Sequence, residues 1–405
     1  MHFHKYSEKR TKPVCKHFSM CGGSHWQHLK YVEQLQFKQK EVQKNLLRIG
    51  GLDLPPVSPI IGSAKTYHYR NKLEFTFSNA QWLSAEKIRR GQPIPNREAL
   101  GFHLPQRWNK TFDLEDFYLQ ATPSKEIRLT IEEYVIKQEW LFYDLKRQEG
   151  FLLTLLIQVS YTGEVMVLIQ FFSDDEAKRR ALFEFLQERF PKKKYLLDAI
   201  NNKGNASIYD IQVQYFYGRL FIYEEREGLR FKVDAKSFFQ IHSEQAYVFY
   251  KVTRNFASLL ETESIYDLYT GIGTIAQFIS AQTHKVISFE PFLEAIALAE
   301  ENARLNSSID NCIFFCGDIK TLFTTDFVEE QGKPKVVIAD PTRQGMHEKV
   351  IETLLKIEPQ RIVYVSCNSA TQARNIALIE KHYTLSRVQP IDIFPQTRHV
   401  ENVLL

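Results

Sequence analysis

Three side chains that could do chemistry follow two short apolar runs near the C-terminus. Asp340 and Arg343 come directly after the run VVIA at 336–339, and Cys367 follows the run IVYV at 362–365. Both runs predict buried parallel strands. Ligands of an open α/β sheet bind beyond the carboxyl ends of such strands. We therefore expect these side chains to face one pocket, in which the Cys367 thiol can act as a nucleophile.

Each of these side chains also has a plainer interpretation. Free cysteines usually behave as small buried apolar residues, and we expect that of Cys312 and Cys316, which lie on or beside an apolar run. Cys367 differs because a polar turn follows it. Asp340 could cap the turn after its strand. Arg343 could be an ordinary surface arginine, although its planar guanidinium suits a phosphate or a flat ring.

A glycine-rich turn earlier in the chain is typical of nucleotide sites. The segment DLYTGIGTIA, 267–276, follows an apolar run and opens a helix, so Gly271 lets the backbone approach a ligand. Glu290 ends the next apolar run, where a carboxylate can bind two ribose hydroxyls, and Asp318 has the equivalent place one run later, suited to an adenine amino group. The string GIGTIA also matches a dinucleotide fingerprint, so a nicotinamide or flavin oxidoreductase stays open.

Strands and helices alternate from residue 236 to the end of the chain. The strand candidates are IYDLY (265–269), KVISF (285–289), CIFF (312–315), KVVIA (335–339), RIVYV (361–365), TLSRVQPI and HVENVLL. Helical stretches lie between most of them. This alternation predicts an α/β fold with a Rossmann-like, doubly wound, mostly parallel sheet.

Two other segments precede that sheet. Residues 52–235 contain short β-like runs, a hairpin in which YTGE joins two apolar runs, and a helix that opens on a capping box from Ser173 to Glu176. They predict a β-rich α+β central domain. Residues 1–51 combine a basic arm with a helix from Leu29 to Arg48, whose apolar residues at 32, 35, 42, 46 and 49 share one face. The expected domains are 1–51, 52–235 and 236–405.

Composition sets broad limits on function. The 405 residues are 44% hydrophobic and 25% charged, as in an ordinary globular protein, and no apolar run reaches the length of a membrane span. The N-terminus lacks a signal-peptide core, and five cysteines suit a reducing compartment, so we expect a cytoplasmic protein. The net charge of +4 permits a polyanionic partner without requiring one. The basic runs RNK (70–72), KIRR (87–90) and KKK (192–194) are interpreted as solvated faces.

Taken together, the motifs resemble those of the RNA uracil-5-methyltransferase family. The matching strings are FFQ (238–240), DLYTGIG, the FEP that contains Glu290, the GD of Asp318, DPTRQG (340–345), YVSCN (364–368) and DIFPQTRHVENV (392–403). They occur in the family's order, and the resemblance covers residues 15–405. Within the family, CGGSHWQHLKYVEQLQFKQ and YRNKLEF are more similar to the enzymes that act on 23S ribosomal RNA than to those that act on tRNA.

The resemblance implies a cofactor, S-adenosylmethionine, and a covalent mechanism. Carbon 5 of uracil is a poor nucleophile until a thiolate adds to carbon 6, so Cys367 is implied as the nucleophile and Glu401 as the base. Asp340 is implied to line the pocket of the uracil and the sulfonium. The implied cofactor-binding residues are Gln240, Tyr269, Gly271, Thr274, Glu290, Asp318 and Asp340. An unperturbed thiol has a pKa of about 8.5, so the site must assist its ionisation.

One departure from the family concerns metal. Many of the ribosomal RNA enzymes bind a four-iron cluster through four cysteines, three of them spaced C-x5-C-x2-C. Here Cys15 and Cys21 fit, whereas Ser24 and Phe117 stand at the other two positions, and a phenyl ring cannot coordinate iron. We expect no iron-sulfur cluster and no metal. A metal held by Cys15, Cys21 and histidines such as His17, His25 or His28 is the remaining alternative.

Other departures concern the cofactor and the N-terminus. His242 stands where an asparagine is usual, and Thr342 where a second proline is usual, so a weakened member is conceivable. Only fourteen residues precede Cys15, too few for the small oligonucleotide-binding barrel of many relatives. Either the protein works without that domain or it has been removed.

The expected partner is RNA, with 23S ribosomal RNA as first choice and tRNA as second. Single-stranded bases are recognised by aromatic stacking within basic grooves. Tyr67, Tyr69, Arg70 and Trp108 offer that mixture, although a core position is the better expectation for any single aromatic. A dinucleotide oxidoreductase and an RNA-binding protein without catalysis remain as alternatives from other classes. No obligate protein partner is evident.

Overall fold

The computed structural model describes residues 7–83, 88–89, 97–192 and 194–405, and these form two compact units. The first unit comprises residues 1–29, 65–224 and 233–236. The second comprises 30–64, 225–232 and 237–405. This division differs from the three consecutive segments expected from the sequence, because the chain passes between the units several times.

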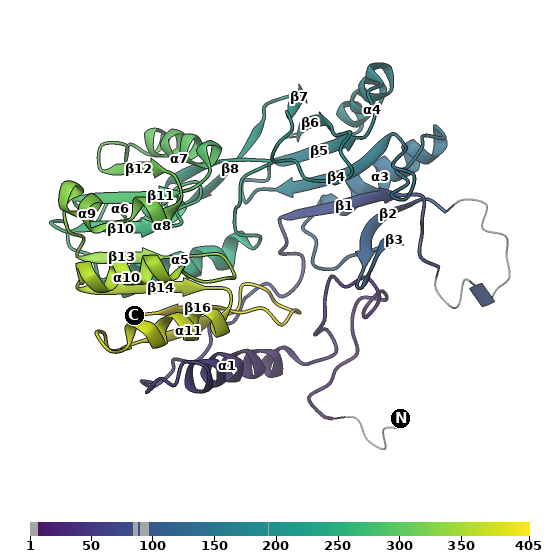
Figure 1. Ribbon diagram of the computed structural model, residues 1–405. Helices are drawn as coiled ribbons and strands as arrows, with labels where there is room; N and C mark the ends of the chain where they lie inside the picture. Colours follow the sequence, from purple (N-terminus) through teal and green to yellow (C-terminus); the bar gives the residue numbers. More distant parts are fainter. Residues whose placement is uncertain (1–6, 84–87, 90–96, 193) are drawn as a thin grey trace. The chain divides into compact units, whose positions relative to one another are not determined.

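A seven-stranded sheet forms the centre of the second unit (Figure 1). Its strands are β10 (Ser264–Leu268), β11 (Lys285–Glu290), β12 (Cys312–Cys316), β13 (Val336–Ala339), β14 (Arg361–Ser366), β15 (Val388–Ile391) and β16 (Glu401–Leu404). Their spatial order is β12-β11-β10-β13-β14-β16-β15. The first five pair in parallel, whereas β16 is antiparallel to both of its neighbours. The order reverses between β10 and β13, where ligands bind in such sheets.

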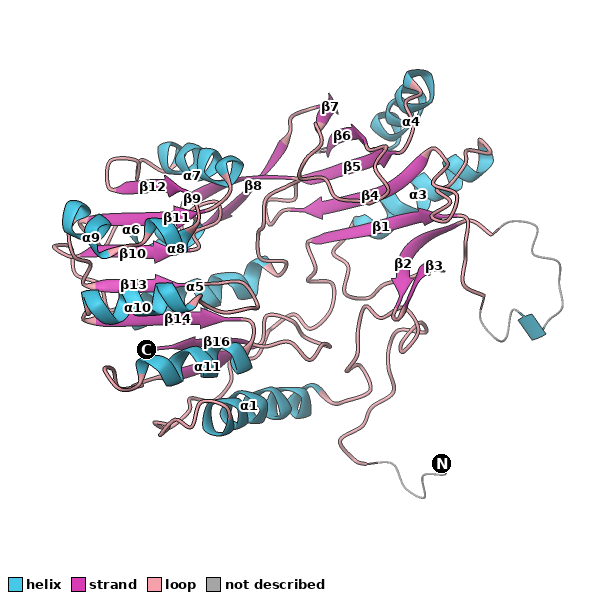
Figure 2. Ribbon diagram, in the orientation of Figure 1, coloured by secondary structure: helices cyan, strands magenta, loops and turns pink. Residues whose placement is uncertain are grey.

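Helices cover both faces of this sheet (Figure 2). The helices are α5 (Ser243–Ala257), α6 (Thr274–Ser280), α7 (Leu293–Leu305), α8 (Ile319–Leu322), α9 (Thr325–Gln331), α10 (Glu348–Ile357) and α11 (Ser369–Ile379). Helix α5 packs on β14 and β16, α6 and α7 pack on β11 and β12, and α10 packs between α11 and the α8–α9 pair. Among the described residues, no helix combines the length and apolarity needed to cross a bilayer.

Helix α1 (Tyr31–Arg48) packs beside α11 and belongs to the second unit. Its inward residues are Gln34, Lys38, Val42 and Leu46. The apolar face expected from the sequence is therefore wrong in part, since Val32 is 56% exposed and Ile49 is 51% exposed. The reason is tertiary: only the C-terminal half of α1 meets the apolar core, where Val42 and Leu46 join the sheet residues. The N-terminal half meets polar groups instead.

The first unit contains a second seven-stranded sheet, in the order β3-β2-β1-β4-β5-β6-β7. Its elements are β1 (Lys72–Ser78), β2 (Ala99–Leu104), β3 (Arg107–Asp113), α3 (Ser124–Lys137), β4 (Leu152–Val159), β5 (Val165–Phe171), α4 (Glu176–Arg189), β6 (Lys194–Ile200) and β7 (Gln214–Tyr217). Strands β8 (Phe221–Arg226) and β9 (Leu229–Asp234) pair separately. The hairpin β4–β5 forms as expected, and alternate residues of β1 enter the core with residues of α3 and α4.

Two local expectations need correction. The capping box is wrong, because Asp175 caps α4 by accepting the Lys178 N–H at 3.1 Å, while the Ser173 hydroxyl donates to the Gly150 carbonyl. Cys316 is exposed rather than buried, since it ends the edge strand β12, whereas Cys312 is buried as expected. Of the basic runs, Lys87 and Arg90 of KIRR and the middle lysine of KKK lie outside the described residues.

We expect Leu46→Ala to destabilise the second unit by about 2–5 kcal/mol, because it removes buried apolar atoms of α1 and leaves a cavity. Leu47→Ala, one position along and 52% exposed, should change stability by less than about 0.5 kcal/mol. Chemical denaturation followed by circular dichroism measures both. Equal effects of the two substitutions would contradict the packing of α1.

Candidate functional site

Cys367 and Glu401 meet at one edge of the sheet in the second unit. Strands β14 and β16 are antiparallel, with Ser366 opposite Asn402. Cys367 directly follows Ser366 and Glu401 directly precedes Asn402, so one further step in this register would set them opposite each other, and the Glu401 carboxylate is near enough to raise the pKa of the thiol. Residues opposite each other in an antiparallel pair project to the same face, with Cβ atoms about 4.5–5.5 Å apart. Because β14 ends where β16 begins, the thiol and the carboxyl group share one site.

A buried amide pair holds the two strands in this register. The Gln372 side chain of α11 donates to the carbonyl of Tyr364 at 2.9 Å and to the carbonyl of Asn402 at 3.2 Å. The Asn402 side-chain amide donates in turn to Gln372 Oε1 at 2.8 Å. Both amides are buried, so these bonds form away from water and fix the strand ends to α11.

Arg343 is directed at the thiol by the turn that follows β13. Its carbonyl accepts hydrogen bonds from the Asn368 side chain and the Thr371 hydroxyl, each at 3.1 Å. The positive charge of the nearby Arg343 guanidinium lowers the pKa of the Cys367 thiol, against the effect of burial. Sequence reasoning did not find this partner of the thiol. The available signal was its position three residues after the Asp340 that ends the strand.

The remaining electrostatics of the site oppose negative charge. Burial raises the pKa of Cys367 to about 11, with Glu401 as the next cause, against the effect of Arg343. Burial also raises the pKa of Glu401 to about 8, helped by the nearby Asp340. The pKa of Asp340 rises to about 7 for the same reason, burial. A cation entering this site would relieve all of these penalties, so the site favours a positively charged ligand.

The glycine-rich turn after β10 adopts the backbone that a nucleotide site requires. Tyr269, Gly271 and Gly273 have φ angles of 70°, 58° and 79°. Such a φ is uncommon for tyrosine and marks strain that is typical of functional sites. Glu290, at the end of β11, accepts the Gly271 N–H at 3.1 Å and the Phe292 N–H at 3.4 Å. The carboxylate of Glu290 is therefore held directly against the turn.

This turn has room for a ligand. A Cβ atom placed on Gly271 would meet no atom within 4 Å. A carboxylate offers about four acceptor positions, so Glu290 retains capacity for two hydroxyl groups after its two backbone bonds. The residues of the turn thus fit a ribose-containing cofactor.

Asp340 connects the nucleotide turn with the thiol. The buried Asp267, at the start of the turn, accepts a hydrogen bond from the Thr270 hydroxyl at 2.6 Å. Its pKa is raised to about 7, mainly by burial and also by Asp340 and Glu290. On the other side, Asp340 raises the pKa values of Cys367 and Glu401. Its carboxyl group is therefore near both the turn after β10 and the thiol, and its role between cofactor and substrate stays a prediction.

The other expected cofactor residues differ in burial and in their contacts. Gln240 and Thr274 are buried, and Thr274 is the first residue of α6. Burial raises the pKa of Tyr269 to about 12, and the negative charge of the nearby Asp318 is the second cause. Asp318 caps α8 by accepting the Lys320 N–H at 3.1 Å and pairs with the Lys320 ammonium at 2.9 Å. Its carboxylate is exposed and already has these partners.

Both departures near the cofactor turn keep the local structure intact. His242 Nδ1 accepts the Gln245 N–H at 3.4 Å and so caps α5, a role that asparagine also performs. The Thr342 carbonyl accepts the Gly345 N–H at 2.9 Å and closes the turn that carries Arg343.

Comparisons with known proteins agree with this geometry. A family model described as tRNA (Uracil-5-)-methyltransferase matches residues 323–405. An uncharacterized RNA methyltransferase of Bacteroides thetaiotaomicron is 47% identical over 406 residues, which cover 100% of this chain and 89% of the relative. Another, of Chlorobaculum tepidum, is 35% identical over 402 residues, covering 98% and 83%. The chain belongs to the RNA uracil-5-methyltransferase family.

A solved structure shares the fold of this methyltransferase. A Pyrococcus abyssi tRNA (uracil-54, C5)-methyltransferase, crystallised with S-adenosyl-L-homocysteine, superposes with a TM-score of 0.74 at 25% identity, over 95% of this chain and 86% of that one. The resemblance found in the motifs is therefore confirmed. The expected doubly wound α/β sheet of an S-adenosylmethionine-dependent methyltransferase is also confirmed.

The residues at the cluster positions of this methyltransferase do not fit an iron-sulfur cluster. The Ser24 hydroxyl accepts a hydrogen bond from the Gln27 side chain at 2.8 Å, and Gln27 also accepts the Cys15 N–H at 3.0 Å. The Phe117 ring packs so closely on Gly23 that a Cβ there would collide with it. Among the residues that the structure describes, no group of three or more His, Cys, Asp or Glu side chains could hold a metal.

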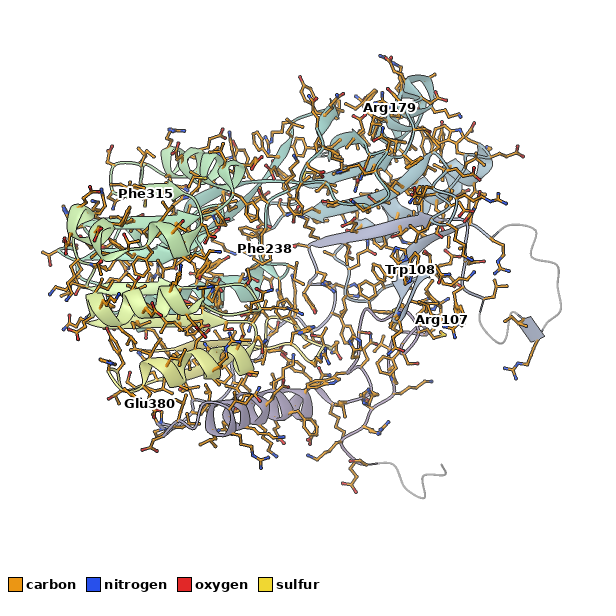
Figure 3. The ribbon with its side chains drawn as sticks, viewed as in Figure 1. Arg107, Trp108, Arg179, Phe238, Phe315 and Glu380 are labelled. Atoms are coloured by element: carbon orange, nitrogen blue, oxygen red, sulfur yellow. The ribbon has the colours of Figure 1, made fainter. Side chains whose placement is uncertain are left out.

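The aromatic residues that are candidates for RNA contact differ in how exposed their side chains are. Trp108 and Phe238 are labelled in Figure 3. Tyr69 is buried in the core of the first unit, as expected for most of them. Trp108, near the start of β3, is 68% exposed, and the neighbouring Arg107 lies over the Trp82 ring at 4.9 Å. In the second unit, Phe238 is 73% exposed, two residues before Gln240, and sequence reasoning had not singled out its side chain.

We expect Glu401→Gln to stabilise the protein at alkaline pH. Folding raises the pKa of Glu401 from 4.5 to about 8, because the buried site favours the neutral carboxyl group. The contribution of this neutral group to folding stability is fully present below pH 4.5 and is lost as the pH rises through 8. Glutamine stays neutral and avoids this loss. The melting temperature should therefore exceed that of the native protein by about 2–4 °C at pH 8.5, with a smaller difference at pH 5. Glu380→Gln, at an exposed position, is the control.

Proposed function

We propose that this protein transfers a methyl group from S-adenosylmethionine to carbon 5 of a uridine in RNA, through a covalent bond between Cys367 and carbon 6. The observation that supports the proposal is the antiparallel pairing of β14 with β16, because Cys367 follows the last residue of β14 and Glu401 is the first residue of β16. A nucleophile and a base beside the strand-end Asp340 are the groups that this reaction needs.

Cys367 starts the reaction by adding to carbon 6 of the uracil. Burial keeps the pKa of its thiol high, so the positive charge of the nearby Arg343 is needed to stabilise the thiolate after the proton has left to solvent. Addition makes carbon 5 electron-rich. Cys367 also begins the loop before α11, whose N-terminus favours an anion.

Glu401 completes the reaction by removing a proton. Once carbon 5 carries both the methyl group and its original hydrogen, the Glu401 carboxylate accepts that proton. The carbon–sulfur bond then breaks, the double bond between carbons 5 and 6 returns, and Cys367 leaves as a thiolate. A base with a raised pKa, about 8 here, accepts a proton effectively near neutral pH.

We assign the cofactor-binding roles starting from the turn after β10. Glu290 would bind the ribose hydroxyls, and Asp318 would accept from the adenine amino group, with Gln240, Tyr269, Gly271 and Thr274 around them. Asp340 would face both the sulfonium and the uracil. The sulfonium supplies an electrophilic methyl group and a positive charge. That charge favours ionised Asp340 and Glu401, whose burial otherwise disfavours their charged forms.

We infer 23S ribosomal RNA as the substrate class, with bases stacking on exposed aromatics such as Trp108 and Phe238. Support comes from the N-terminal CGGSHWQHLKYVEQLQFKQ and from YRNKLEF, which are similar to the ribosomal RNA enzymes. A uridine in tRNA is the second candidate. The observation in its favour is the structural similarity to a tRNA (uracil-54, C5)-methyltransferase.

The covalent step predicts two opposite phenotypes. Cys367→Ala should abolish methyl transfer without forming any RNA adduct. Glu401→Gln should lower turnover at least about 100-fold and accumulate an adduct stable to denaturation, because addition and methylation proceed while elimination stops. The measurement uses tritiated S-adenosylmethionine and total RNA from cells that lack the protein, with label on the protein counted after nuclease digestion. Cys316→Ala, an exposed cysteine elsewhere, should behave as the native enzyme. Unaltered methylation by Cys367→Ala would exclude the covalent mechanism.

The substrate class is tested in cells. Loss of the protein should remove 5-methyluridine from one position or more of 23S ribosomal RNA and leave tRNA unchanged. Mass-spectrometric mapping of both RNA classes, with and without the gene and with a Cys367→Ala complement, measures this directly. A loss confined to tRNA would establish the second candidate instead, and no loss in either class would favour an RNA-binding protein without catalysis.

A further inference from the structure

The segment from 392 to 400 links β15 to β16 and leads directly into Glu401. It contains no helix or strand, and its internal hydrogen bonds form local turns, such as the Thr397 N–H to the Phe394 carbonyl at 3.2 Å, so the path of the chain into Glu401 also depends on contacts from outside the segment. A proton transfer tolerates little displacement of the base, since about 1 Å of misplacement can lower a rate about 100-fold. Something outside the segment must therefore hold it.

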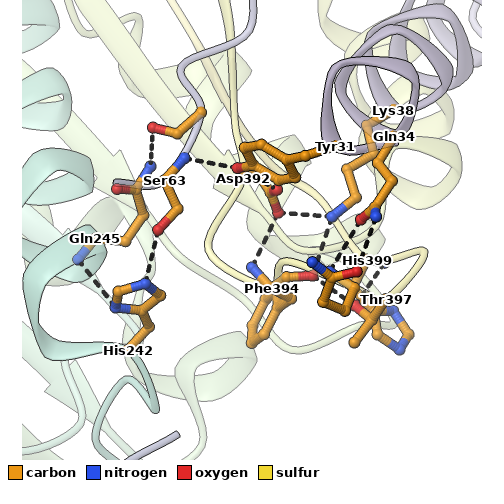
Figure 4. Close-up of polar contacts among 12 residues, drawn as sticks. Tyr31, Gln34, Lys38, Ser63, His242, Gln245, Asp392, Phe394, Thr397 and His399 are labelled. Carbon is orange, nitrogen blue, oxygen red and sulfur yellow. Dashed lines mark hydrogen bonds and ion pairs between the residues drawn. The ribbon is translucent and has the colours of Figure 1, made fainter. Parts of the chain in front are cut away.

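The polar half of α1 holds the start of this segment (Figure 4). Lys38 Nζ donates to Asp392 Oδ1 at 2.6 Å and to the Phe394 carbonyl at 3.0 Å. The side chains of Lys38 and Asp392 are both fully buried. Asp392 Oδ1 also accepts the Phe394 N–H at 3.1 Å, and Asp392 Oδ2 accepts from the Tyr31 hydroxyl at 2.8 Å.

A second contact holds the middle of the segment. Gln34, one turn before Lys38, donates to Gln396 Oε1 at 2.9 Å and accepts the Gln396 N–H at 3.0 Å. Gln396 has a φ of 65°, which is uncommon for a residue other than glycine. Strained backbone persists only where surrounding contacts determine it. The reciprocal amide bonds with Gln34 provide that constraint.

The same network reaches the cofactor side of the second unit. The Tyr31 hydroxyl accepts the Ser63 N–H at 2.7 Å, and the Ser63 hydroxyl is hydrogen-bonded to His242 Nε2 at 2.8 Å. His242 caps α5 and lies two residues after Gln240. A continuous set of polar contacts therefore joins the segment before the base to the segment that follows a cofactor residue (Figure 4).

Stability alone does not account for a buried charge pair at this place. Removing two charges from water is costly, and well-packed apolar residues of similar volume are often as stable or more stable. Apolar side chains, however, would not specify one position for a segment without secondary structure. The directional bonds of Lys38 and Gln34 do.

We propose that Lys38 and Gln34 are positioning residues, which hold segment 392–400 so that the Glu401 carboxylate is placed to remove the proton from carbon 5. The inference rests on the proposed function of Glu401. It assigns to α1 a part in one chemical step, proton abstraction, and none in the addition of Cys367 or in cofactor affinity.

The test compares three variants of the full chain. Lys38→Met/Asp392→Asn removes both charges together, so that neither is left buried alone. Gln34→Leu conserves the approximate side-chain volume and removes the bonds to Gln396. Lys44→Met, at an exposed position of the same helix, is the control. Each is assayed with tritiated S-adenosylmethionine and total RNA from cells that lack the protein, and rates are normalised to the folded fraction from circular dichroism.

We expect both positioning variants to lower kcat at least about tenfold while KM for S-adenosylmethionine stays within about twofold. The protein-linked methyl label should rise several-fold, as in Glu401→Gln, because elimination is delayed after methylation. A purely structural role would lower kcat and the label together. If the double variant does not fold, Gln34→Leu decides.

Two results would overturn the proposal. One is a kcat of Gln34→Leu, per folded molecule, equal to that of the native protein. The other is a lowered kcat in the positioning variants without an increase in the protein-linked methyl label. Glu401→Gln separates the two levels of inference. If it accumulates label and the α1 variants do not, only the positioning role fails, whereas if Glu401→Gln itself forms no adduct, the proposed function of Glu401 fails first.

Discussion

The antiparallel insertion of β16 between β14 and β15 is the constraint on which the site depends. In a wholly parallel sheet, the residue that begins a strand lies at the edge opposite to the residue that ends its neighbour. Because β16 runs in the other direction, its first residue, Glu401, meets the end of β14, where Cys367 lies. The amide pair of Gln372 and Asn402 maintains this register. The reaction thus depends on a single reversal of strand direction.

The same edge gathers charge that is costly to bury. Asp267, Asp340 and Glu401 all have pKa values raised by burial, and the thiol of Cys367 is raised as well. The fold therefore buries groups whose charged forms are disfavoured there, at a cost in stability that active sites commonly show. Arg343 provides the opposing positive charge. Its turn is tied to the start of α11, which directly follows the segment of Cys367, so Arg343 and Cys367 are positioned by the same helix.

Much of the second unit could be predicted, and the errors have a common cause. The runs at 265–269, 285–289 and 361–365 became β10, β11 and β14 because dense apolar residues encode buried strands locally. The predicted buried face of α1 was wrong because two of its four inward residues, Gln34 and Lys38, are polar. They bond to residues that are distant in the sequence, Gln396 and Asp392. The predicted burial of Cys316 was wrong because an apolar run does not reveal that its strand lies at a sheet edge.

From the sequence by itself came the residue types that the reaction needs, their order along the chain, the strands that carry them and the family. Such features depend on neighbours a few positions apart, through propensity, burial pattern and turn chemistry. Only the tertiary structure decided that Glu401 and Arg343 lie near Cys367 and that α1 bonds to the segment before Glu401. These contacts join distant positions, and strand order and side-chain packing, which no local pattern specifies, determine them.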